Sequence, residues 1–400
     1  MTTVSGQTDQ RLPSQVFQIN LQANFGGGEI YTRFFSNALL ELGISATLFV
    51  SPRARYWDQL GLKGVRIVPV GDEKEIEAAL GDPGKFVVTH TLGNPEFSAR
   101  LAQRHILSGF AHMPWFQRDP SRFGAYHRIF AVSRHVLDSL GSHGLNVYPH
   151  PLYGVADLQP RSIADPVENG TRIVASSIYD WDRRKLRDRL LGLMEPIAQT
   201  LRKKREFVRR PGLTLGIVSR LTPIKQFPLL FQHLSPILQS FPKVNLEIFG
   251  SGGYASVRDL KASLTPIQNN VRFWGHQPDP AAIYPMLDFV LSGLPEREAL
   301  GLNLIEAQYC GTPVLAVDAP PFTETVADGV SGYLYCDPRK DNGAGFAALL
   351  RRLLTEQSFP RPNLADAHLA QFSREAFRQR VAEALAATWN QPRTRMQESV

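Results

Sequence analysis

Short apolar runs rich in β-branched residues alternate along the chain with stretches in which apolar residues recur every few positions. The first run covers residues 15–21, and a glycine-containing turn and a longer stretch at 29–43 follow it. In that stretch the apolar residues lie four apart, at Ile30, Phe34, Ala38 and Leu42. This spacing predicts a strand followed by an amphipathic helix, with Gly43 at the C-terminal cap of the helix.

The same alternation continues in both halves of the chain. Strands of the first half are predicted at 46–51, 65–70, 85–90 and 128–133. Strands of the second half are predicted at 213–219, 244–250, 271–275, 288–293, 312–318 and 332–335. Strands that alternate with helices are typical of βαβ units on a parallel sheet, so the chain is predicted to be an α/β protein.

The order of these elements predicts two domains, which also suits a chain of 400 residues. Residues 1–155 are expected to form an N-terminal Rossmann-like domain, and 212–370 a C-terminal Rossmann-like domain. Between them, 156–211 interrupts the alternation with polar, proline-containing sequence and is interpreted as a linker with a basic inserted helix. The last part, 371–400, is a helix that could pack back on the N-terminal domain. Ligands of open α/β sheets bind at the carboxyl ends of the strands, so the chemistry is expected in a cleft between the domains.

Composition narrows the class of protein. Hydrophobic residues make up 43% and charged residues 20%, as in soluble globular proteins. The sequence has neither an apolar run long enough for a membrane span nor the apolar stretch of a signal peptide near its start. Two cysteines, Cys310 and Cys336, do not suffice for a disulfide framework or a metal site. These features favour a cytoplasmic protein.

The net charge of +7 is concentrated in the insert at 183–210, which contains eleven Arg and Lys residues. One interpretation is a solvated helix and linker. Another is a binding surface for a phosphate-rich acceptor or for the inner face of an anionic membrane. Nucleic acid is not expected as a partner, because no nucleic-acid-binding motif accompanies the charge.

The segment 296–316 combines a glycine, an apolar helix pattern and glutamates at Glu298 and Glu306. Glu298 is predicted in the loop before the helix, and Glu306 one turn inside it. A loop entering a helix offers free N–H groups and a partial positive charge to an anion. Ionised carboxylates on either side accept hydrogen bonds from hydroxyl groups. A phosphate between two sets of hydroxyls describes a nucleotide sugar, although two solvated glutamates at a helix start would give the same pattern.

The segment closely resembles the signature of retaining glycosyltransferases of family 4, in which two glutamates are separated by seven residues. Here the signature reads Glu298-Ala299-Leu300-Gly301-Leu302-Asn303-Leu304-Ile305-Glu306. The resemblance implies the GT-B fold: two Rossmann-like doubly wound domains that face each other across a cleft. It assigns the acceptor side to 1–155 and the donor to 212–370. It also implies transfer of a hexose, such as mannose, glucose or rhamnose, from a UDP- or GDP-linked donor without a metal or other cofactor. A polysaccharide, a lipopolysaccharide or a lipid-linked glycan is the expected acceptor.

Further motifs extend this resemblance over nearly the whole chain. Residues 216–230 look like the family segment whose Arg and Lys hold the donor diphosphate, which assigns that role to Arg220 and Lys225. Residues 249–253, with Gly250, are similar to the glycine turn near the base. In the N-terminal half, Gly27 and Gly28 resemble the glycine loop that approaches the phosphates and the acceptor.

A histidine near the donor sugar is also common in the family, and His112 matches it. His90, at the end of an earlier predicted strand, is a second candidate. Outside the resemblance, a histidine at a strand end is more often structural.

The resemblance assigns a role to each of these groups. Arg220, Lys225 and the backbone N–H groups near Leu302 and Asn303 would stabilise the charge that grows on the leaving diphosphate. Glu298 would bind sugar hydroxyls and Glu306 the ribose, while the other domain would position sugar and acceptor. The sequence departs from the family at Ser219, Gln226 and Ala299, where glycine is usual. None of these departures removes a charged group.

Other classes of protein remain as alternatives. A metal-dependent GT-A transferase would need an Asp-x-Asp motif, which Asp180 and Asp182 supply within a basic segment. A dinucleotide oxidoreductase would need a Gly-x-Gly-x-x-Gly turn after the first strand, which the sequence lacks. A non-catalytic protein that binds nucleotide sugars is the third alternative.

Overall fold

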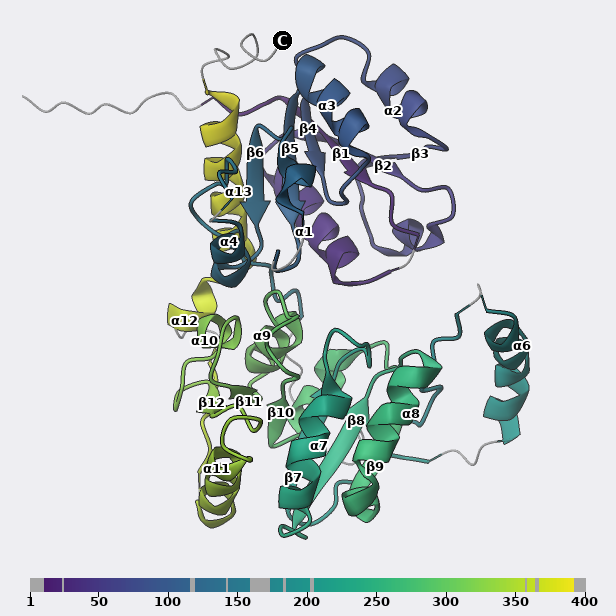
Figure 1. The fold of residues 1–400 in the computed structure, drawn as a ribbon, viewed down its shortest axis with the longest axis vertical. Coiled ribbons are helices and arrows are strands. Elements are labelled where there is room, and N and C mark those ends of the chain that lie inside the picture. The colour runs from purple at the N-terminus through teal and green to yellow at the C-terminus, as the bar shows by residue number, and fades with distance from the viewer. Residues whose placement is uncertain are drawn as a thin grey trace, which may run out of the picture. The chain divides into compact units, whose positions relative to one another are not determined.

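The computed structural model describes residues 11–23, 25–115, 119–141, 143–158, 173–182, 185–201, 205–356, 358–363 and 367–391. The chain divides into two compact units (Figure 1). The first unit comprises Met1–Val155 together with Gln371–Val400, and the second comprises Ala156–Ala370. The chain therefore passes from one unit to the other twice.

The first unit is built on a parallel sheet whose six described strands have the order β3-β2-β1-β4-β5-β6. The strands are β1 (Gln15–Asn20), β2 (Ser45–Val50), β3 (Arg66–Pro69), β4 (Phe86–Thr89), β5 (Ile106–Ala111) and β6 (Arg128–Ala131). The helices are α1 (Gly27–Glu41), α2 (Glu73–Leu80), α3 (Pro95–Arg104), α4 (Arg134–Leu140) and α13 (Arg374–Trp389), with short 3-10 turns at Arg55–Gln59 and Pro120–Phe123. The strand order reverses between β1 and β4, which is where ligands bind in doubly wound folds.

Helix α13 completes the first unit by packing against α1. The rings of Tyr31 and Phe377 lie 5.6 Å apart, edge to face. At the end of α1, a nitrogen of Arg374 lies 3.7 Å from a carboxylate oxygen of Glu41. Phe377, Val381 and Leu385, which lie four residues apart on one face of α13, are all buried.

The second unit repeats the same architecture in the order β12-β11-β10-β7-β8-β9. Its strands are β7 (Leu213–Val218), β8 (Val244–Phe249), β9 (Val271–Gly275), β10 (Phe289–Leu291), β11 (Val314–Val317) and β12 (Gly332–Tyr335). Its helices are α6 (Leu186–Leu201), α7 (Phe227–Leu238), α8 (Tyr254–Ser263), α9 (Leu302–Tyr309), α10 (Phe322–Thr325), α11 (Ala344–Thr355) and α12 (Ala367–Ala370), with 3-10 turns at Thr265–Asn270, Pro280–Ala282 and Tyr284–Met286. Here the strand order reverses between β7 and β10.

The predicted strands of both units are confirmed, and β5 is the strand that the pattern did not predict. Ser108 and Gly109 interrupt its apolar run. Glycine is required at 109 because a Cβ atom there would lie 2.6 Å from the ring of Tyr126 and 2.9 Å from Oγ1 of Thr89. Packing between neighbouring strands, rather than local preference, therefore determines this part of the sheet.

The segment 156–211, which we expected to be a linker with an inserted helix, belongs to the second unit. Ile173, Ile178 and Phe207 are buried in the core of that unit. Tyr179 also forms a β-bridge with Gly252, next to β8. Helix α6 is the inserted helix. The basic residues at 183–184 and 202–204 lie outside the described residues.

Candidate functional site

The loops that follow β7 and β10 meet at the carboxyl edge of the second sheet, because these two strands are neighbours. Lys225 lies in the first loop and Glu298 in the second. The Lys225 Nζ atom donates a hydrogen bond to Glu298 Oε2 at 2.5 Å and another to Asn303 Oδ1 at 3.4 Å. The two charged side chains are only 19% and 12% exposed, so the sheet topology brings together a largely buried ion pair.

The other carboxylate oxygen of Glu298 is also engaged. Its Oε1 accepts hydrogen bonds from the backbone N–H groups of Ala299 and Gly301, each at 3.2 Å. Burial acts to raise the pKa of this carboxyl, but the Lys225 ammonium and the backbone donors outweigh burial and lower the pKa. Glu298 is therefore held as a carboxylate in a fixed orientation.

Gly301 is the N-cap of α9 and adopts the left-handed region, with φ of 79°. No side chain caps this end of the helix. Leu302 and Asn303 are the first two residues of α9, where backbone N–H groups have no partner within the helix. Together with the partial positive charge of the helix N-terminus, these groups form a site suited to an anion.

Glu306 lies one turn inside α9, as predicted, and contacts Tyr284. The Tyr284 hydroxyl lies 3.2 Å from Glu306 Oε2 and 3.2 Å from the carbonyl oxygen of Asn303, so it donates to one of them at a time. Burial, with the Glu306 carboxylate adding to it, raises the pKa of Tyr284 well above its usual range. The sequence analysis missed Tyr284, because its 3-10 turn carries no motif and lies 22 positions before its partner.

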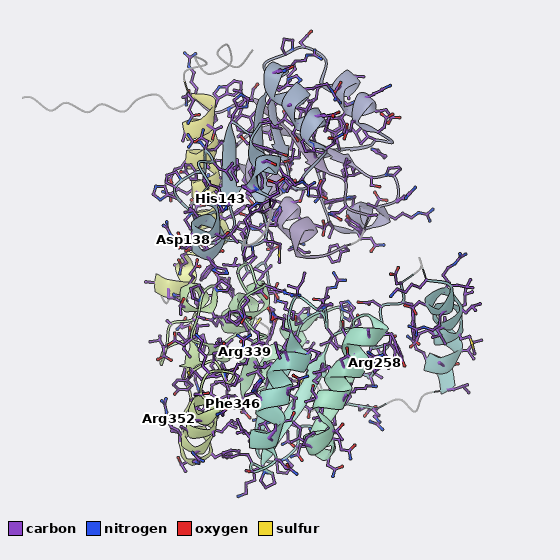
Figure 2. The ribbon with its side chains drawn as sticks, viewed as in Figure 1. Asp138, His143, Arg258, Arg339, Phe346 and Arg352 are labelled. Atoms are coloured by element: carbon purple, nitrogen blue, oxygen red, sulfur yellow. The ribbon has the colours of Figure 1, made fainter. Side chains whose placement is uncertain are left out.

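The third glutamate of this segment has a different partner. Glu296 pairs with Arg339, a residue beyond β12 that Figure 2 marks in the second unit. Arg339 Nε also donates to Asp337 Oδ1 at 2.9 Å, and these hydrogen bonds lower the pKa of the Asp337 carboxyl. Glu296 therefore links the loop after β10 to the loop after β12, two strands away in the sheet.

Two glycines allow the loops of this site to approach each other closely. At Gly250, where φ is 157°, a Cβ atom would lie 1.8 Å from the carbonyl oxygen of Ser219. At Gly293 it would lie 2.2 Å from the carbonyl oxygen of Lys225. The sequence analysis found Gly250 but missed Gly293, for which a glycine at the end of the predicted strand 288–293 was the available signal.

Arg220 lies in the same loop as Lys225, two positions after the end of β7, and is exposed. The loop ends at Gln226, whose φ of 53° is unusual for a residue other than glycine. This conformation explains why glycine is usual at that position in the family that the segment resembles. Gln226 therefore adopts the backbone conformation that glycine would adopt there, and its side chain makes that conformation strained.

In the first unit, His90 follows β4 and His112 follows β5. The two imidazole rings stack with centroids 5.7 Å apart, and His90 Nε2 lies 3.0 Å from Gln18 Oε1. Among the described residues, His90 Nδ1 and His112 Nε2 are buried without a hydrogen-bond partner. Burial lowers the pKa of His112 to about 4 and that of His90 well below its usual range, so both imidazoles are neutral near pH 7.

Gly27 and Gly28 open α1, directly after the loop that follows β1. Gly26, the N-cap, provides no side-chain hydrogen bond. A Cβ atom at Gly27 or Gly28 would meet none of the described atoms within 4 Å. The described part of the folded chain therefore does not itself require glycine at these two positions.

Asp180 of the Asp-x-Asp motif is hydrogen-bonded to the loop that follows β8. Asp180 Oδ1 accepts a hydrogen bond from Ser251 Oγ at 2.7 Å, and the Asp180 N–H donates to the carbonyl oxygen of Gly252. Within the described part of the chain, no group of three His, Cys, Asp or Glu residues is placed to hold a metal ion. The described part also contains no helix of the length and apolar character needed to span a bilayer.

Comparison with known proteins identifies the part of the chain that carries most of this site. Residues 199–375 match the family model of glycosyl transferases group 1. These residues form a glycosyl transferases group 1 domain. The group 1 domain contains Arg220, Lys225, Gly250, Glu298 and Glu306, whereas the glycines and histidines of the first unit lie outside it.

Curated relatives match over a similar stretch. The D-inositol 3-phosphate glycosyltransferase of Segniliparus rotundus is 34% identical over 127 residues, covering 30% of this chain and 28% of the relative. The phosphatidyl-myo-inositol mannosyltransferase of Mycobacterium leprae is 31% identical over 148 residues, covering 36% and 38% of the two chains. The chain thus matches about a third of the length of these relatives.

Solved structures match over almost the whole chain. Anabaena Alr3699/HepE in complex with UDP and glucose gives a TM-score of 0.66 at 16% identity, covering 94% of this chain and 100% of that one. The pneumococcal O-GlcNAc transferase GtfA in complex with UDP and GlcNAc gives 0.65 at 11% identity, covering 95% and 100%. The predicted GT-B class, with two doubly wound α/β units, is therefore confirmed. The chain therefore does not have the GT-A fold that the metal-dependent alternative required.

Proposed function

We propose that the chain is a retaining glycosyltransferase. It would transfer a hexose from a UDP- or GDP-linked donor to a polysaccharide, a lipopolysaccharide or a lipid-linked acceptor. The observation that carries this proposal is the buried Lys225–Glu298 ion pair beside the uncapped N-terminus of α9, within a group 1 domain. The names of the relatives support sugar transfer, since they include inositol and lipid glycosyltransferases.

The donor diphosphate would bind at the N-terminus of α9. An ammonium group has three N–H donors, and Glu298 and Asn303 accept two of those of Lys225, which leaves the third for a phosphate oxygen. The backbone N–H groups of Leu302 and Asn303 supply further donors without adding a mobile charge. Arg220, in the same loop as Lys225, offers a planar fork that matches phosphate geometry.

The hydroxyl groups of the donor would bind the two carboxylates. Glu298 is fixed by Lys225 and two backbone donors, and its lone pairs would accept hydrogen bonds from the sugar. Glu306, oriented by Tyr284, would accept hydrogen bonds from the ribose. Gly250 would bring the backbone close to the base. The two glutamates would thus contact the donor on either side of the diphosphate, at the sugar and at the ribose.

The chemical step breaks the bond between the anomeric carbon and the diphosphate oxygen. The oxygen of an acceptor hydroxyl bonds to that carbon, and its proton passes to the leaving diphosphate or to water. Negative charge then grows on the leaving phosphate, so fixed donors and cations at that point lower the barrier most. Lys225, Arg220 and the N-terminus of α9 supply them. On this proposal, His112 contacts the sugar as a neutral imidazole, and the backbone at Gly27 and Gly28 contacts the donor and the acceptor.

A nucleotide-sugar panel tests this proposal directly. UDP-, GDP-, dTDP- and ADP-linked sugars are compared by thermal shift, and nucleotide release is then measured with and without candidate acceptors. A shift with one donor, together with acceptor-dependent release of its nucleotide, supports transfer, and NMR of the product gives the anomeric configuration. A shift without release in the presence of any acceptor indicates a non-catalytic binding protein. If no nucleotide sugar shifts the melting temperature, the assignment of the site is wrong.

A further inference from the structure

Helix α6 has one face turned toward the rest of the second unit. Asp188 and Glu195 on this face are 4% and 9% exposed. Glu195 Oε2 accepts a hydrogen bond from Trp181 Nε1 at 3.3 Å, and Asp188 Oδ2 accepts one from the Asp182 N–H at 3.4 Å. Between them, Gly192 lies against Trp181, since a Cβ atom there would be 3.2 Å from Trp181 Cβ. The acidic side chains of α6 are therefore directed inward.

An aromatic cluster links α6 to the start of α8. The ring of Trp181 lies 5.0 Å from that of Tyr179 and stacks at 6.4 Å on that of Tyr254, the first residue of α8. The guanidinium of Arg187 lies 4.7 Å above the ring of Tyr254. These contacts fix the rotation of the helix about its axis and hence determine its outer face.

The outer face of α6 is apolar and exposed. Its side chains are Leu186, Leu190, Leu193, Met194, Ile197 and Leu201, with exposed fractions of 72%, 57%, 75%, 62%, 63% and 81%. Steps of three and four residues place them in one stripe, opposite the inward face. Monomeric soluble proteins rarely expose a contiguous apolar surface of this kind without a binding role.

Cationic side chains border the apolar stripe. Lys185 and Arg189 are exposed, whereas the Arg187 guanidinium is directed to the inward side, where it pairs with Asp188 at 3.1 Å and lies over Tyr254. Along the sequence, two arginines precede this part of the chain at 183–184, and an Arg-Lys-Lys run follows it at 202–204, outside the described residues. Because the two acids face inward, the outer side of α6 combines an apolar stripe with positive charge.

We propose that the outer face of α6 docks on an anionic membrane surface. An amphipathic helix with a leucine-rich face and basic borders lies in the interface plane, with its apolar side in the boundary between headgroups and acyl chains. Long cationic side chains at the borders reach the lipid phosphates. A second copy of the chain fits this surface less well, because the basic borders of two such faces would repel each other. This proposal does not depend on the proposed catalytic function.

Vesicle flotation tests the proposal, with phosphatidylcholine vesicles compared with vesicles that also contain phosphatidylglycerol. The wild-type protein is expected to float with the anionic vesicles. The triple variant Leu190→Ser, Leu193→Ser, Ile197→Ser should bind them at least ~10-fold more weakly, because three apolar side chains are lost. The variant Lys185→Glu, Arg189→Glu should bind more weakly at low salt and lose much of the salt dependence. Val330→Ser changes an exposed apolar residue elsewhere in the second unit and should float like the wild type.

The proposal fails if the wild type does not float with anionic vesicles or if the triple variant floats equally well. It also fails if sedimentation velocity shows a dimer that the triple variant dissociates, since a second copy would then cover the face. Melting curves and the nucleotide-sugar shift are recorded on the same variants. An unchanged melting curve shows that the variant is folded, and an unchanged nucleotide-sugar shift shows that its donor site is intact. Lost flotation in such a variant is then a loss of membrane docking.

Discussion

Lys225 Nζ lies 2.5 Å from Glu298 Oε2, although 73 positions separate the two residues in the sequence. Their loops follow neighbouring strands at the point where the strand order reverses. Each charge is largely buried, so each depends on the other to offset the loss of hydration. The pair therefore joins the two loops of the site both electrostatically and sterically.

Removing a cation from the proposed donor site should slow the chemical step. We expect Lys225→Ala and Arg220→Ala each to lower turnover by roughly 10²–10³-fold, the usual effect of losing one group that stabilises the transition state. Steady-state kinetics with the donor found in the nucleotide panel measures this. Lys243→Ala, which changes an exposed lysine of the same unit, is the control. Activity within a few-fold of wild type in both variants would place neither residue in the site.

The ion pair should also make stability depend on pH. The pKa of Glu298 is lowered in the folded state, so its contribution is present above the ordinary carboxyl pKa and is lost as the pH falls through the lower folded value. Lys225→Met leaves a buried carboxylate unpaired and should cost about 1–3 kcal/mol at pH 7. Urea unfolding should show this difference shrinking in acid, and Lys225→Met, Glu298→Gln should recover much of it. A loss that is independent of pH would contradict the pairing.

His112 should act on stability over a different range of pH. Its pKa is lowered from 6.5 to about 4, so the unfolded chain binds more protons than the folded chain between these values. Stability should therefore rise with pH from about 4 to 6.5, by roughly 3 kcal/mol from this residue, and then level off. Urea unfolding across this range should give a flatter profile for His112→Gln. An unchanged profile would show that His112 is accessible to protons in the folded state.

Two glycines of the site should respond differently to alanine. Gly250→Ala places a Cβ atom 1.8 Å from a backbone oxygen, so we expect the second unit to fold poorly or not at all. Gly28→Ala meets no described atom within 4 Å, so its melting temperature should match wild type. If ligand approaches the backbone at 28, this variant should still lose turnover. Wild-type kinetics for Gly28→Ala would remove that glycine from the site.

Chelation should leave the reaction unchanged. The proposed site stabilises the leaving phosphate with Arg220, Lys225 and the N-terminus of α9, which take the place of a divalent ion. We therefore expect full turnover in excess EDTA, measured as nucleotide release. Loss of activity that Mg²⁺ or Mn²⁺ restores would mean that a metal ion supplies part of this charge.

Much of the fold could be predicted because both sheets are parallel and covered by helices. Strands such as β4 and β11 are buried along their whole length and therefore read as apolar runs in the sequence. Strand β5 was missed because a glycine interrupts its apolar run. Gly109 is needed there because the ring of Tyr126, a residue beyond the strand, leaves no room for a Cβ atom. Contacts of this kind depend on the assembled sheet and leave no local pattern.

The charged residues of the site were found through motifs, but their partners were not. The motifs contain Lys225 and Glu298 without showing that the two side chains form an ion pair. Tyr284 and Gly293 carry no motif at all, and their importance comes from proximity to Glu306 and to the Lys225 backbone. Such relationships arise only when strands distant in the sequence become neighbours.

Helix α13 belongs to the first unit, although the chain forms the whole second unit before reaching it. On the ribosome, the residues up to Val155 emerge early but cannot cover α1 until 374–389 have been synthesised. The second unit, in contrast, is a single stretch of the chain, Ala156–Ala370, and can close on itself as it emerges. The unit that is translated first is therefore completed last, and until then the surface of α1 that α13 covers stays exposed and can be bound by chaperones.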